Sequence, residues 1–133
     1  MTQLITDQGF VTDDFATGYA PLGTDQDVIA VNVPSDARPD DIPLPKGLQM
    51  IRVDFPQSAD GRGFTLARQL RLRGYTGRLR ACGHVIADQY AMARRSGFDE
   101  VEIPDDLAAR QPQDQWLARA NWKDHDYQSR LRG

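Results

Sequence analysis

The sequence contains one cysteine, Cys82, and two histidines in 133 residues, and this scarcity excludes several classes of site. A single thiol cannot form an internal disulfide or a multi-cysteine zinc or iron–sulfur centre. No apolar run approaches the ~18 residues that a membrane-spanning helix needs. The first residues, MTQLITDQGF, have neither a basic start nor an apolar block, so no secretory signal is visible. We therefore expect a cytoplasmic protein with no metal site and no membrane partner.

Charge is unevenly distributed along the chain, although the net charge is only −3. Residues 1–55 carry nine aspartates and three bases, residues 61–95 carry eight arginines and one aspartate, and residues 96–133 carry eight acids and five bases. A nucleic-acid-binding domain usually has an undiluted basic face and a basic pI, whereas the sequence pI here is about 5.2. Nucleic acid is therefore not an expected partner, and the arginines need another explanation.

The apolar spacing between residues 50 and 104 alternates between the period of a strand and that of a helix. It predicts strands at Met50–Phe55, Arg78–Cys82 and Glu100–Pro104. Two helices are predicted between them, and glycines at positions 74 and 97 are suited to end these helices. Short connections of this kind favour parallel strands with right-handed crossovers. The fold class is therefore α/β, a small, mostly parallel sheet with a β-α-β-α-β core at residues 50–103.

The two ends of the chain follow other patterns. Leu4–Thr6 and Phe10–Val11, around a turn with Gly9, predict an N-terminal β-hairpin. A β-rich run, Asp27–Pro34, precedes a connector with three prolines, Ser35–Gly47, which indicates a loop or a reduced crossover. We expect a single domain at residues 1–106 and an irregular or helical C-terminal tail at residues 107–133.

The loop after the strand at 50–55 is the most informative candidate site. Parallel sheets bind ligands at the carboxyl ends of their strands. Gly61 and Gly63 permit close backbone approach and positive φ, and Arg62 adds a forked donor suited to sulfite, sulfate, phosphate or carboxylate. Other segments that follow strands complete a candidate anion-binding set: Asp60, Gly61, Arg62, Gly63, His84 and Asp88. The alternative is a structural turn in which Arg62 pairs with its neighbour Asp60.

Two further groups of residues invite an interpretation. Arg78 and Arg80 alternate around Leu79, so both point to one side of their strand and need partners, for which the acids of the N-terminal region are suited. In the tail, aromatic side chains near arginines have the composition of interface anchors. These are Trp116, Trp122 and Tyr127, which either pack back on the sheet or contact a partner.

A series of polar and glycine positions matches a known family in order and spacing. The matching residues within 50–103 include Asp54-Phe55-Pro56, Asp60-Gly61-Arg62-Gly63-Phe64, Ala67-Arg68, Leu79-Arg80-Ala81, Asp88-Gln89 and Gly97-Phe98-Asp99. This segment resembles the bacterial domain-of-unknown-function family numbered 934. Two positions depart from the family pattern: Gly83-His84-Val85 stands where Gly-Asp-Val is common, and Arg95-Ser96-Gly97 where Arg-Cys-Gly is frequent.

The resemblance implies a role in sulfite reduction within assimilatory sulfate metabolism. We expect an accessory protein that docks on assimilatory sulfite reductase or a related larger redox enzyme and binds a small oxyanion, with a homodimer as a second form of partnership. The alternative is a small enzyme, an oxidoreductase of sulfite reduction, with its site at the carboxyl ends of the strands. Because the chain has neither a cofactor fingerprint nor a cysteine pair, no cofactor is expected.

Overall fold

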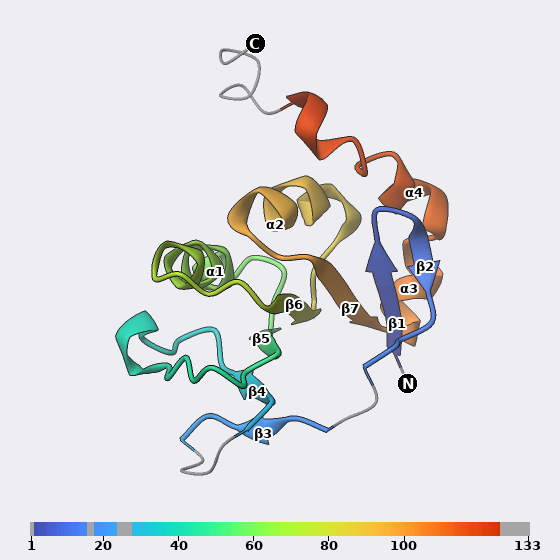
Figure 1. The fold of residues 1–133 in the computed structure, drawn as a ribbon. Coiled ribbons are helices and arrows are strands. Elements are labelled where there is room, and N and C mark those ends of the chain that lie inside the picture. Colours follow the sequence, from blue (N-terminus) through green and yellow to red (C-terminus); the bar gives the residue numbers. More distant parts are fainter. Residues whose placement is uncertain (1, 16–17, 24–27, 126–133) are drawn as a thin grey trace.

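A seven-stranded sheet organises residues 2–15, 18–23 and 28–125, which the computed structural model describes (Figure 1). The strand order is β2-β1-β7-β6-β5-β4-β3. Neighbours from β3 to β7 are parallel, and β1 is antiparallel to both β2 and β7. The predicted mostly parallel α/β sheet with an N-terminal hairpin is therefore confirmed. The strands are β1 (Thr2–Thr6), β2 (Gly9–Val11), β3 (Ala20–Pro21), β4 (Ala30–Val33), β5 (Met50–Phe55), β6 (Arg78–Gly83) and β7 (Glu100–Pro104).

Helices α1 and α2 form crossovers between parallel strands, and the helices cover one face of the sheet (Figure 1). They are α1 (Arg62–Leu72), α2 (Tyr90–Ser96), α3 (Asp105–Arg110) and α4 (Gln113–Leu117), with short 3-10 helices η1 (Pro39–Asp41), η2 (Ala87–Gln89) and η3 (Trp122–His125). Gly74 and Gly97, just after α1 and α2, have φ angles of 98° and 116°, so both end their helices as predicted. Among the described residues, every helix falls short of the length and apolar character that a membrane crossing requires.

The hydrophobic core lies between the sheet and α1 and α2. Alternate strand residues such as Ile51, Val53 and Leu79 point into it and are fully buried. The core also continues beyond residue 106, where a tail was expected to begin. Leu107 from α3 and Trp116 from α4 belong to the same buried cluster. Residues 107–117 are therefore part of the packed domain.

The opposite face of the sheet carries no helix among the described residues and is unusually polar. Its alternate residues are Asn32 on β4, Arg52 and Asp54 on β5, Arg78, Arg80 and Cys82 on β6, and Glu100 and Glu102 on β7. Residues 12–15 and 18–19, between β2 and β3, run along this face (Figure 1). Asp13 contacts Arg80 there, and the ring of Tyr19 lies 3.9 Å from the Arg52 guanidinium carbon. A layer of ion pairs therefore takes the place of a second layer of helices.

The two glycines of the loop after β5 have different structural roles from those expected. Neither has a positive φ angle. A Cβ on Gly63 would lie 2.4 Å from the ring of Phe55, whereas a Cβ on Gly61 would meet open space. Gly63 is therefore required by the close packing of α1 on β5, and not by the backbone conformation.

We predict that Gly63→Ala lowers the free energy of unfolding by about 1–3 kcal/mol, because the methyl group must displace a packed aromatic ring. Gly61→Ala is the matched control, since it adds the same group two residues away and costs less than about 1 kcal/mol. Urea unfolding of the two variants checks the difference. Equal losses of stability in both would contradict the packing explanation.

Candidate functional site

Asp60, in the loop after β5, and Arg62, at the start of α1, were both expected to bind an anion, and their side chains bind each other. Arg62 donates from Nε and Nη2 to the two carboxylate oxygens of Asp60, at 2.9 and 2.8 Å. Asp60 also accepts a hydrogen bond from the Ser35 hydroxyl at 2.9 Å. The hydrogen bonds from Arg62 hold the pKa of the Asp60 carboxyl well below its ordinary value. The forked donor thus already holds a carboxylate of its own loop, as in the structural-turn alternative.

The other members of the expected anion-binding set have separate surroundings. His84 is exposed, and its backbone N–H donates to the carbonyl of Phe55 at 2.8 Å. Asp88 accepts a hydrogen bond from Arg119 at 2.8 Å on the surface. Within the described part of the chain, no hydrogen bond or ion pair joins either residue to the Asp60–Arg62 pair. Direct contacts therefore do not assemble the six residues into one site.

Arg80 is the centre of the polar face of the sheet. It is fully buried, and its Nε donates to Glu100 at 2.6 Å. Its Nη1 donates to Glu102 and to Asp13, both at 2.9 Å. Hydrogen bonds from Arg80 also lower the pKa of the Asp13 carboxyl. A buried guanidinium with three carboxylate partners needs no ligand to balance its charge.

Neighbouring residues extend this network across four strands, β4 to β7. Arg78 Nη2 bonds Asp14 at 2.9 Å, so the prediction that N-terminal acids pair with Arg78 and Arg80 is confirmed. Arg52 donates to Asn32 at 2.8 Å and reaches Glu102 at 3.3 Å. Arg52 and Glu102 were not expected in this network, although the side-chain period of the strands places both residues on the same face as Arg80.

Cys82 lies on the same polar face, and its thiol is poorly reactive. Burial raises the pKa of its thiol to about 12, and contact with Glu102 acts in the same direction. The thiolate is the nucleophilic form of cysteine, so a thiol that stays protonated at neutral pH is a poor nucleophile. Cys82 therefore behaves as a structural residue.

We predict that Arg80→Met destabilises the fold by about 3–5 kcal/mol at neutral pH, because Glu100 and Glu102 lose the buried cation between them and keep only Arg78 and Arg52 as partners. Arg68→Met, on the exposed side of α1, removes the same charge and should change stability by less than about 0.5 kcal/mol. Thermal unfolding followed by circular dichroism checks both variants. A small effect of Arg80→Met would show that the buried carboxylates find other partners.

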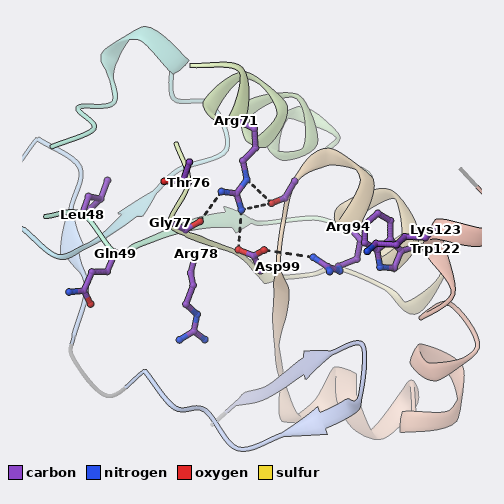
Figure 2. A pocket seen from close by; sticks show the side chains of 11 residues that line it. Leu48, Gln49, Arg71, Thr76, Gly77, Arg78, Arg94, Asp99, Trp122 and Lys123 are labelled. Atoms are coloured by element: carbon purple, nitrogen blue, oxygen red, sulfur yellow. Dashed lines mark hydrogen bonds and ion pairs between the residues drawn. The ribbon is translucent and has the colours of Figure 1, made fainter. Parts of the chain in front are cut away.

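A depression of about 860 Å³ lies at the amino ends of β5, β6 and β7, at the end of the sheet opposite the turn between β5 and α1 (Figure 2). Arg71 from α1 lines it and makes five hydrogen bonds, four of them to the carbonyls of Tyr75, Gly77 and Gly97. One of the five reaches Asp99 at 3.0 Å, and Arg94 approaches the same carboxylate to 3.8 Å. The depression is thus lined by arginines that also join α1, α2 and the starts of the strands.

The aromatic residues assigned to a partner interface lie in different places. Trp116 is 1% exposed, donates its indole N–H to Gln111 and packs edge-on against Tyr90. Because it is buried in its own chain, the expectation that Trp116 anchors a partner is corrected. Trp122 is half-buried at the rim of the depression, with the Arg94 guanidinium 4.7 Å from its ring centre. Tyr127 lies outside the described residues.

Comparison with known proteins identifies the family. Residues 30–133 match the model of a bacterial protein family of unknown function, DUF934. The chain belongs to this family. Searches among curated proteins and among solved structures found no match. Family membership therefore agrees with the resemblance seen in the sequence, and its description assigns no activity.

Ser96 lies at the end of α2 and is buried. It is 2% exposed, and its hydroxyl has no hydrogen-bond partner among the described residues. A buried hydroxyl without a partner lowers stability, because it loses its hydrogen bonds to water on folding.

We predict that Ser96→Ala leaves stability unchanged or raises it, because the buried hydroxyl is unsatisfied. Ser35→Ala should instead lower stability by about 1 kcal/mol or more, because it removes a hydrogen bond to a charged carboxylate. Chemical denaturation of the two variants tests the contrast between two buried serines. A loss in Ser96→Ala equal to that in Ser35→Ala would mean that the hydroxyl of Ser96 has a bonding role.

Proposed function

We propose that this protein is an accessory protein of sulfite reduction in assimilatory sulfate metabolism. It acts by docking on assimilatory sulfite reductase or a related larger redox enzyme. The metabolic setting follows from the resemblance of the sequence to the DUF934 family. The mode of action follows from the state of the side chains that are suited to chemistry.

One observation carries the docking role: three side chains suited to chemistry, Cys82, Arg62 and Arg80, are committed to holding the fold together. Burial keeps the Cys82 thiol protonated at neutral pH. The Arg62 fork is occupied by Asp60, and Arg80 is enclosed by carboxylates. These groups stabilise the sheet and its loops. This arrangement favours an accessory protein over a small enzyme with a site at the carboxyl ends of the strands.

The shape of the surface supports the same proposal. Small-molecule sites usually enclose most of their ligand. The depression at the amino ends of β5, β6 and β7 is instead broad and open, and it is lined by charged side chains together with Trp122 and Leu48. A mixed polar and apolar surface of this kind is suited to contact with another protein.

The experiment is a binding measurement between this protein and purified assimilatory sulfite reductase from the same bacterium. A complex with a Kd of about 1–10 µM is expected, in the range of transient protein contacts of modest size. An unrelated protein with the same net charge serves as the control. The absence of a complex at about 100 µM would overturn the proposal.

A turnover assay addresses the enzymatic alternative. The protein alone, supplied with sulfite and a chemical electron donor, is expected to consume no sulfite. Its addition to the reductase is expected to change the rate or the stability of that enzyme. Sulfite consumption by the isolated protein would favour the small-enzyme alternative instead.

A further inference from the structure

Two neighbouring depressions lie at the amino ends of the parallel strands of the sheet. The larger one, shown in Figure 2, shares Leu48, Thr76 and Gly77 with a second depression of about 240 Å³. Among the described residues that line the two, one is acidic, Asp99. Six are cationic: Lys46, Arg71, Arg73, Arg78, Arg94 and Lys123. These six residues define the amino-edge surface.

Part of this positive charge is not neutralised within the chain. Arg73 donates to the carbonyls of Pro39 and Ile42, which carry no net charge. Lys46 and Lys123 are exposed, and no ion pair joins either of them to an acid whose side chain the structure describes; Lys123 lies over the Trp122 ring. The acids bonded to the remaining cations are Asp7, Asp14, Asp99 and Glu100, four for the whole surface. A positive excess therefore remains in a protein whose net charge is negative.

The other edge of the sheet has the opposite character. Acids follow the carboxyl ends of β4, β5 and β7 and the turn after β6; they are Asp36, Asp60, Asp88, Asp105 and Asp106. Three of these acids are paired with arginines, which leaves an excess of two negative charges among the five. The charge of the molecule is thus separated along the direction of the parallel strands. Such a separation orients a protein as it approaches a charged partner and accelerates association.

We propose that the amino-edge surface is the docking surface of this protein and that its occupant is an acidic segment of a partner protein. This inference rests on the proposed function and names the part of the molecule that performs it. Half-buried Trp122 supplies apolar contact beside the cations. Acids interspersed among the arginines, Asp99 above all, disfavour the continuous phosphate charge of a nucleic acid.

The test uses two double variants with the same change of net charge. Lys46→Glu with Lys123→Glu reverses the two exposed lysines of the amino-edge surface. Arg68→Glu with Arg110→Glu, on the exposed sides of α1 and α3, is the matched control. Melting curves first establish that both variants are folded, which their exposure favours.

The probe is a fluorescein-labelled decaglutamate peptide, and binding is followed by fluorescence anisotropy at about 50 mM salt. The parent is expected to bind the peptide, the lysine variant to bind at least about tenfold more weakly, and the control to stay within about twofold of the parent. Failure of the parent to bind, or an equal loss in both variants, overturns the proposal. Tighter binding of a labelled decathymidylate than of the peptide also overturns it, in favour of a nucleic acid.

The same variants, measured against sulfite reductase, separate this inference from the proposed function. If the reductase binds the parent and the lysine variant equally well, docking stands and this surface is excluded. If the peptide shows the expected pattern and the reductase does not bind, the surface stands and the named partner is wrong.

Discussion

The buried guanidinium of Arg80 is the interaction on which the arrangement of this protein depends. It sits in the middle of the sheet without exposure to water, and it is balanced by carboxylates from β7 and from the chain after β2. An unpaired charge at this depth would cost far more than the fold can supply. The N-terminal chain must therefore lie across this face of the sheet, and a helix with an apolar side could not replace it.

This constraint gives the two faces of the sheet different roles. The face under α1 and α2 is an ordinary apolar core, which the aromatic cluster of Phe55, Phe64 and Phe98 helps to fill. The other face is held by directional ion pairs, with Tyr19 stacked on Arg52. Directional bonds tolerate few substitutions. The charged residues of the sheet therefore hold residues 13–15 and 19–21 in one position.

The arginines of residues 61–95 consequently form distinct groups. Arg71 and Arg80 are saturated by internal acceptors and hold elements together. Arg62 forms an ion pair with Asp60, two residues before it. Arg73 keeps its charge while it binds neutral carbonyls, and with the exposed lysines it gives one edge of the sheet its positive excess. Composition alone does not separate these groups, because it carries no information on which acceptors a guanidinium meets.

Local patterns predicted much of the fold. Alternating apolar periods located β5, β6 and β7 with the helices between them, and Gly74 and Gly97 marked the helix ends. The alternation around Leu79 also indicated that Arg78 and Arg80 need acidic partners. These features depend on a few consecutive residues, whose spacing alone decides which side of an element they face.

Tertiary structure decided what depends on residues far apart in the chain. The hairpin is placed beside β7 by pairing across about a hundred residues of sequence, which no local pattern encodes. Trp116 entered the core because α3 and α4 fold back beside the hairpin and η2. By itself the sequence determined which elements form and which faces are charged; only tertiary packing decided which charges remain free to meet a partner, because neutralisation depends on neighbours brought together in space.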